Sequence, residues 1–193
     1  MMANIVNIDI DDGVSFELDG QEPIKEDNEY GGYKFKVIAK CSNLIIPFFI
    51  DISTGDIITP RALEYKYKLI LEDGFIDLYT YNYETIIAEK LETILKRNVA
   101  NSRMKDFYDI YFFVNYKWEE LNLEILKKSI TTTFKHRNSE FELSSWREEI
   151  EKIANNENIL KLWQMYVEKH QYAKNIGFSE VINSIVYLCE NII

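Results

Sequence analysis

Hydrophobic and polar positions alternate through most of the first 81 residues. This two-residue period is typical of β-strands with one buried face, and it predicts strands at 4–11, 14–18, 33–40, 65–71 and 76–81. In residues 33–40, apolar side chains alternate with lysines, as in an antiparallel sheet with one solvated face. Residues 43–52 are almost all apolar and favour a strand covered on both faces that ends at Asp51, whereas residues 19–32 are expected to be irregular.

Beyond Tyr81 the apolar residues recur at the longer spacing that is typical of amphipathic helices. Asn82 is a favourable N-cap for a helix over 83–97, in which Ile87, Leu91 and Ile94 form the buried stripe. A polar link over 98–102 ends in a capping residue, Ser102, and precedes a helix with Phe107, Ile110, Tyr111 and Val114 on its apolar face. Further helices are predicted at 123–136, 145–155, 158–174 and 179–191.

The order of the elements, strands first and helices second, predicts the α+β class. We expect a strand-rich domain over residues 1–81, with a mixed or antiparallel sheet, followed by a helical bundle over residues 82–193.

Composition narrows the class of protein. With 47% hydrophobic and 28% charged residues the chain is globular, and its net charge of −10 disfavours non-specific nucleic-acid binding as the main activity. Cys41 and Cys189 lack metal-ligand spacing and are expected to be reduced, buried thiols. The longest apolar run is too short to span a bilayer, so we expect a cytoplasmic protein without a membrane segment.

Lys90 is the first residue that could carry chemistry, since it lies at the margin of the buried stripe of 83–97. A lysine in this place either extends its ammonium group to solvent or reaches into a cleft and holds nucleotide phosphates. In the next helix, Arg103 falls on the apolar face, Asp106 at its edge and Asp109 further round. The two acids either pair with Arg103, Lys105 or Lys90, or orient a catalytic group.

Three acids of the strand-rich half are weaker candidates. Asp51, at the end of an apolar strand, either bonds to the turn that follows or serves as a metal ligand or base in phosphoryl transfer. Asp9 and Asp11 have the spacing that places two carboxylates on one face of a strand, which is also common on a solvated face. His136 and His170 have no partner at ligand spacing and are interpreted as structural or surface residues.

Taken together, several motifs of the chain resemble those of the AbiEii/AbiGii family of nucleotidyltransferase toxins, which belong to bacterial abortive-infection toxin–antitoxin systems. The motifs are the segments 51–61 (DISTGDIITPR), 81–93 (YNYETIIAEKLET) and 101–109 (NSRMKDFYD). The resemblance implies a nucleotidyltransferase-like sheet followed by helices, and transfer of a nucleotide from a nucleoside triphosphate to an RNA (possibly tRNA in relatives) or protein acceptor, assisted by Mg²⁺ or Mn²⁺.

The resemblance also implies roles for five residues. Asp51 would be the third metal-binding carboxylate, and Lys90 would bind the nucleotide phosphates. Asp106 would be the late catalytic acid, with Arg103 and Asp109 beside the nucleotide.

One motif of the family, a Gly-Gly or Gly-Ser turn leading to an Asp-x-Asp strand, would precede Asp11, and the sequence does not contain it. We therefore expect a shortened member of the family that is a poor catalyst by itself. The alternatives are an inactive remnant that binds a nucleotide or an antitoxin, and one half of a split enzyme. A cognate antitoxin protein is the expected partner, and an exposed sheet edge would favour self-association.

Overall fold

The computed structural model describes residues 2–24 and 31–193. The fold is α+β, as predicted, and its strands form two antiparallel sheets. Contacts group the chain into two compact units, Met1–Asp56 and Ile57–Ile193. The domain boundary expected from the sequence falls later, after Tyr81, so the second unit contains a strand pair as well as the helices that follow it.

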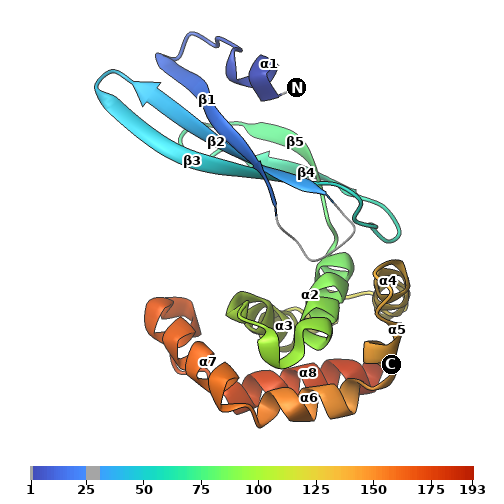
Figure 1. Cartoon of the computed structure of the whole chain (residues 1–193). Coiled ribbons are helices and arrows are strands. Elements are labelled where there is room, and N and C mark those ends of the chain that lie inside the picture. The colour runs from blue at the N-terminus through green and yellow to red at the C-terminus, as the bar shows by residue number, and fades with distance from the viewer. Residues whose placement is uncertain (1, 25–30) are drawn as a thin grey trace. The chain divides into compact units, whose positions relative to one another are not determined.

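The first unit is a three-stranded antiparallel sheet with a short helix before it. After helix α1 (Met2–Val6), strands β1 (Val14–Pro23), β2 (Gly32–Cys41) and β3 (Leu44–Ser53) follow in the order β1-β2-β3 (Figure 1). Strand β2 shows the predicted alternation, since Val37 is buried while Lys36 and Lys40 form ion pairs with Asp19 and Glu17 on β1. Strand β1 extends into the segment predicted to be irregular, of which residues 25–30 lie outside the described part.

The strand predicted at 4–11 is wrong. Its first half is helix α1, and Asp9 and Asp12 accept hydrogen bonds from the backbone N–H groups of Asp11 and Val14, each at 2.9 Å. Aspartates that bond to the backbone two residues on favour turns over strands. Asp9 and Asp11 therefore do not share a strand face.

Strand β3 lies at the edge of this sheet, and the exposure of its side chains shows that the prediction of a strand covered on both faces is also wrong. Leu44, Ile45, Ile46 and Phe49 are 56–67% exposed. The strand continues past Asp51 to Ser53. Cys41, predicted to be buried, is exposed at the end of β2, whereas Cys189 is buried as predicted, and neither forms a disulfide.

The second unit begins with a hairpin of strands β4 (Leu63–Lys68) and β5 (Phe75–Thr80), close to the predicted positions. The α-helices that follow are α2 (Tyr83–Arg97), α3 (Met104–Tyr116), α4 (Leu123–His136), α5 (Glu140–Ser144), α6 (Trp146–Ala154), α7 (Glu157–Lys169) and α8 (Phe178–Ile192). Short 3-10 turns are η1 (Asn98–Ala100), η2 (Trp118–Glu120) and η3 (Gln171–Ala173).

The predicted bounds match α2 and α4, and the differences elsewhere have local causes. Helix α7 ends at Lys169, earlier than predicted, because His170 adopts an extended conformation before η3. Ser102 is not a cap, since Arg103 occupies the N-cap position of α3 without a side-chain hydrogen bond. Helix α8 starts one residue before Ser179, and Glu180 accepts the N–H of Gly177 at 2.7 Å.

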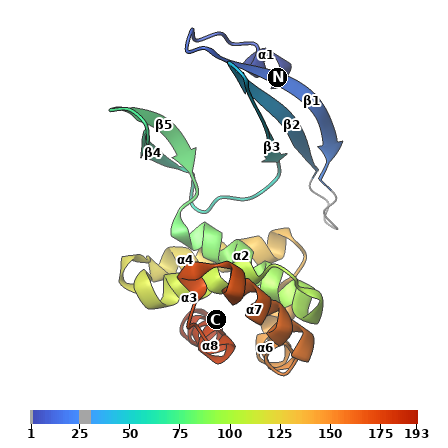
Figure 2. The same cartoon turned by 90° about the vertical axis from the view of Figure 1, so that its left-hand side faces the viewer.

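Helix α2 lies at the centre of the second unit. It packs against both α3 and α4, while α3 packs against α8, as Figure 2 allows the reader to follow. The predicted stripe of Ile87, Leu91 and Ile94 is fully buried. Phe107 of α3 meets Phe178 of α8 with ring centroids 5.8 Å apart. Apolar burial on this scale is the main favourable term in the folding of the unit.

A buried polar network fixes the start of α2 to the loop before the hairpin. The Asn82 side chain accepts the N–H of Thr85 at 2.8 Å and donates its amide to the carbonyl of Thr59 at 2.6 Å. The hydroxyl of Thr85 accepts the N–H of Thr59 at 3.1 Å. All three residues are buried, so each bond replaces one that water can no longer supply.

This network predicts that Asn82→Ala destabilises the protein more than loss of an ordinary cap. The substitution removes both the cap and the amide donor to a buried carbonyl, which together cost about 2–3 kcal/mol. The matched control is Asn122→Ala, which removes the exposed cap of α4 and is expected to cost about 1 kcal/mol. Urea denaturation measures both, and equal losses would contradict the role assigned to the amide of Asn82.

Candidate functional site

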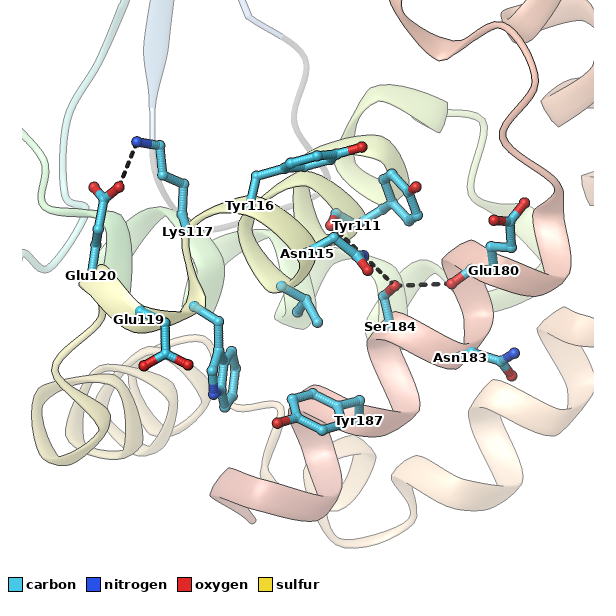
Figure 3. Close-up of a pocket in the computed structure, with 12 residues that line it drawn as sticks. Tyr111, Asn115, Tyr116, Lys117, Glu119, Glu120, Glu180, Asn183, Ser184 and Tyr187 are labelled. Atoms are coloured by element: carbon cyan, nitrogen blue, oxygen red, sulfur yellow. Dashed lines mark hydrogen bonds and ion pairs between the residues drawn. The ribbon is translucent and has the colours of Figure 1, made fainter.

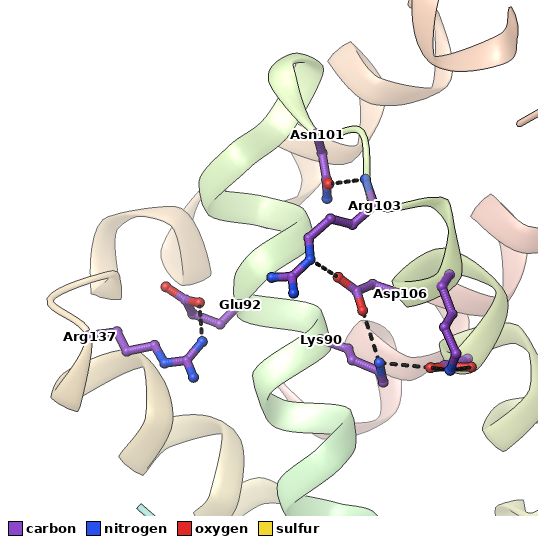
Figure 4. Close-up of polar contacts among 8 residues, drawn as sticks. Lys90, Glu92, Asn101, Arg103, Asp106 and Arg137 are labelled. Carbon is purple, nitrogen blue, oxygen red and sulfur yellow. Dashed lines mark hydrogen bonds and ion pairs between the residues drawn. The ribbon is translucent and has the colours of Figure 1, made fainter. Parts of the chain in front are cut away.

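Lys90 extends from α2 toward α3 and is held there by two carboxylates. Its ammonium nitrogen lies 2.9 Å from Oδ1 of Asp106 and 2.7 Å from Oδ2 of Asp109 (Figure 4). The side chain of Lys90 is 19% exposed and those of the two aspartates are 14% exposed. The ion pairs that the sequence left open as one interpretation are therefore formed, in a partly buried place where charges interact more strongly than at the surface.

Two further cations complete this cluster. Lys105, one turn before Asp109, places its ammonium 2.7 Å from Oδ2 of that residue. Nε of Arg103 lies 3.8 Å from Oδ2 of Asp106. Arg103 was predicted to lie on the buried face of the helix, but its side chain is 53% exposed because it precedes the first turn of α3. Four of the predicted site residues, Lys90, Arg103, Asp106 and Asp109, thus lie together.

The charge state of Lys90 follows from these contacts. Burial by itself would lower the pKa of the ammonium group, but the hydrogen bonds to Asp109 and Asp106 outweigh burial and raise this pKa above its ordinary value. Lys90 is therefore a cation at neutral pH, and it can act as a fixed positive charge but not as a general base.

The cluster opens onto a cleft of about 590 Å³ between the start of α3 and helix α7. The cleft is lined by Lys90, Ser102, Arg103, Met104, Lys105, Asp106, Leu162, Met165, Tyr166, Lys169 and His170. Four lysine or arginine side chains line the cleft with one carboxylate, that of Asp106, and they still outnumber the acids when Asp109, which pairs with Lys90 and Lys105, is counted as well. The positive end of the α3 dipole lies at the same place. The arrangement favours an anionic ligand.

Sequence reasoning missed the wall that α7 contributes. Tyr166, Lys169 and His170 recur at helical spacing, but only the packing of α7 beside α3 brings them to the cleft. His170, interpreted from the sequence as a structural or surface residue, lines the cleft and packs against Tyr166 with ring centroids 4.4 Å apart. Burial and a 2.8 Å hydrogen bond to Tyr172 raise the pKa of Tyr166, so its hydroxyl stays protonated at neutral pH.

Asp51 lies in the first unit, on β3, where it is exposed and has Lys34 of β2 as its cross-strand neighbour. Its predicted role as a metal ligand depends on other carboxylates nearby. Among the described residues, no group of three or more His, Cys, Asp or Glu side chains is placed to hold a metal ion. Asp106 and Asp109 are already neutralised by cations, so the residues described do not fit a divalent metal.

A second ion pair, on the other side of α2, is structural. Figure 4 shows Glu92 and Lys90 extending to opposite sides of the helix. Glu92, 1% exposed, lies 3.0 Å from Arg137 and accepts the hydroxyl of Ser139 at 2.6 Å. Removing one partner of such a buried pair leaves an uncompensated charge, which is strongly destabilising.

The raised pKa of Lys90 predicts how its contribution to stability depends on pH. A lysine whose pKa is higher in the folded state contributes stability that is complete below the unfolded value, about 10.4, and is lost as pH rises through the folded value. At pH 7 we expect Lys90→Met to lower the free energy of unfolding by on the order of 3 kcal/mol, because two carboxylates lose their cation.

This deficit should shrink above about pH 10.4, as measured by urea denaturation between pH 7 and pH 11. Lys161→Met, on the exposed side of α7 and outside the cleft, is the control and should cost little at any pH. A deficit of Lys90→Met that stays constant to pH 11 would contradict the linkage.

Comparison with known proteins adds to this geometry. A family model described as "Nucleotidyl transferase AbiEii toxin, Type IV TA system" matches residues 1–183. No curated protein matches the chain. A crystal structure of a candidate nucleotidyltransferase from H. pylori aligns with a TM-score of 0.44 and 15% identity, covering 92% of this chain and 66% of that one. The chain thus spans a little under two thirds of the length of that protein.

Among the described residues no helix is long and apolar enough to cross a membrane. The family match extends over both units, from the first sheet to helix α8, and includes the Lys90 cluster. The chain belongs to the AbiEii family of nucleotidyl transferase toxins of type IV toxin–antitoxin systems.

Proposed function

We propose that this chain binds a nucleoside triphosphate in the Lys90 cleft and contributes the nucleotide-binding part of an AbiEii-type nucleotidyltransferase. The observation that carries the proposal is the charge of the cleft. Lys90, Arg103, Lys105 and Lys169 line a space of about 590 Å³, and these four cations outnumber the two carboxylates of the cluster, Asp106 and Asp109. A triphosphate is the anionic substrate that nucleotidyl transfer requires.

Lys90 is the residue best placed to contact phosphate. An ammonium group has three donors; Asp106 and Asp109 accept two of them, which leaves the third for an oxygen of the ligand. Since the two carboxylates fix the position of the ammonium, no side-chain freedom is lost when phosphate binds. Asp106 and Asp109 act in this proposal as positioning residues, and Arg103 contacts the phosphates from the rim.

A divalent metal usually accompanies nucleotidyl transfer, and Mg²⁺ or Mn²⁺ would enter with the nucleotide. The described residues do not form a site for it, so no step is assigned to the metal here. The proposed role of Asp51 as its third carboxylate is tested by nucleotide transfer with Asp51→Asn.

The wider function follows from the family. We propose that the acceptor is RNA or a protein, that an antitoxin protein is the partner, and that the system acts in the bacterial cytoplasm against phage, as in abortive infection. The alternative is a non-catalytic module that binds a nucleotide or the antitoxin. Transfer and binding assays together distinguish the two.

Nucleotide binding tests the cleft directly. Calorimetry with each nucleoside triphosphate and Mg²⁺ should show saturable binding, weakened about tenfold or more (~1.4 kcal/mol) by Lys90→Ala and by Lys169→Ala. Lys161→Ala lies on the same helix as Lys169 but outside the cleft, and removes the same charge. If Lys161→Ala weakened binding as much as Lys169→Ala, the effect would be one of net charge and the proposed site would be wrong.

Transfer is measured with labelled nucleoside triphosphates, Mg²⁺ and total RNA. Label incorporated by the chain and lost in Lys90→Ala would establish the enzyme. Saturable binding without incorporation would support the non-catalytic module. If the chain neither bound nor transferred a nucleotide, the proposed nucleotide site would be wrong, and of the alternative only antitoxin binding would remain.

The edge of the first sheet supports a further part of the proposal, association between copies of the chain. Ile45 and Phe49 lie on one face of β3, the edge strand, and are 67% and 60% exposed. Exposed apolar edge strands pair with other chains. Light scattering should show a mass that rises with concentration, and the double variant Ile45→Lys/Phe49→Lys should remain a monomer. A monomeric wild type at high concentration would contradict this association.

A further inference from the structure

A second cleft lies at the other end of α3, where this helix, η2 and α8 meet (Figure 3). Its volume is about 620 Å³, within the range of small-molecule sites. None of the residues that line it lines the Lys90 cleft. It is lined by Tyr111, Val114, Asn115, Tyr116, Lys117, Trp118, Glu119, Glu120, Glu180, Asn183, Ser184 and Tyr187.

Aromatic rings form much of its surface, in two pairs. Trp118 of η2 meets Tyr187 of α8 edge to face at 5.1 Å, and Tyr111 meets Tyr116 edge to face at 6.3 Å. Tyr116 and Tyr187 are 64% and 45% exposed, so these rings are open to a ligand instead of being enclosed in the core. Ring faces carry negative electrostatic potential and attract cations.

The net charge around the rings is negative. Lys117 and Glu120 neutralise each other at 2.7 Å, which leaves Glu119 and Glu180 to set the charge of the cleft. In the described part of the chain the carboxylate of Glu119 forms no ion pair, and the carboxylate of Glu180 accepts the backbone N–H of Gly177. Burial, a hydrogen bond with Tyr116 and the charge of Glu180 raise the pKa of Tyr111.

Between the two carboxylates the floor of the cleft is polar. Figure 3 shows Glu119 on the η2 side, Glu180 on the α8 side, and Asn115 and Ser184 between them. Asn115 donates its amide to the hydroxyl of Ser184 and to the carbonyl of Tyr111, at 2.9 and 2.8 Å. Its own carbonyl oxygen is then directed to accept a further hydrogen bond from a ligand.

We propose that this cleft binds a linear aliphatic diamine or polyamine. Each end of the cleft offers a carboxylate beside an aromatic pair, which suits an ammonium group through charge-assisted hydrogen bonds and cation–π contact. The rings of the two pairs suit the methylene groups next to each ammonium, as apolar surfaces do the stems of lysine side chains. Triphosphates are repelled by the same charges, so the site is separate from the nucleotide cleft and does not depend on it.

The test is titration of the full chain with 1,4-diaminobutane and with spermidine, by calorimetry and by tryptophan fluorescence. We expect saturable binding at one site and a change in emission that Trp118→Phe removes. Butylamine, with one ammonium group, should bind about tenfold more weakly, and 1,4-butanediol should not bind. Absence of saturable binding of either amine at millimolar concentration would overturn the proposal.

Charge-neutral variants test whether the carboxylates of the cleft are responsible for amine binding. Glu119→Gln and Glu180→Gln should each weaken binding about tenfold, and Gln at position 180 keeps an acceptor for the N–H of Gly177. Glu151→Gln, exposed on α6, removes the same charge elsewhere and should leave binding unchanged. An equal loss in Glu151→Gln would show general attraction to an acidic chain and overturn the site.

Titration with a lysine-rich peptide tests whether the cleft binds free polyamines or the lysine side chains of a protein. Under the proposal the peptide binds more weakly than spermidine, because its backbone does not fit between the two acids. Tighter binding of the peptide, weakened by Glu119→Gln and Glu180→Gln, would instead make the cleft a contact for a basic protein and overturn the polyamine assignment.

Discussion

The structure of the second unit depends on the burial of α2. Its apolar side chains are enclosed by α3 and α4, and the polar side chains at its margins are wholly or partly removed from solvent, as with Glu92 at 1% and Lys90 at 19% exposed. Each of these must therefore find a fixed partner on a neighbouring segment. Glu84 accepts the N–H of Asn122 at 2.8 Å, Glu92 pairs with Arg137, and Lys90 pairs with Asp106. The polar contacts that position the candidate site are thus a consequence of packing.

This origin of the site explains why one side chain can serve stability and ligand binding together. The cation of Lys90 is required by Asp106 and Asp109 whether or not a ligand is present. Arg103 and Lys105 contact the same two carboxylates from the solvent side. When phosphate approaches Lys90, these cations can compensate the carboxylates, so that binding need not leave a buried charge unpaired.

Helix α3 separates two regions of opposite charge. Cations surround its first turn, and carboxylates with aromatic rings surround its end. The helix dipole is positive at the first turn and negative at the last, so it strengthens both preferences. An anion and a cation can therefore be held by one helix without competing, since the two clefts share no residue.

The sequence by itself determined the start of α2, for which Asn82 was the predicted cap, and the bounds of α4, which were predicted from its apolar period. Both kinds of signal are local. It also placed Lys90, Arg103, Asp106 and Asp109 among the site candidates. Ion pairs between these acids and cations were one of the two interpretations that it left open. It failed for β3, since apolar content alone does not tell an edge strand from a covered one. Only the tertiary structure decided that Lys169 of α7 and the adjacent His170 line the same cleft as Lys90, and that η2 meets α8 around Trp118. Contacts between segments distant in sequence leave no periodic signal in either segment.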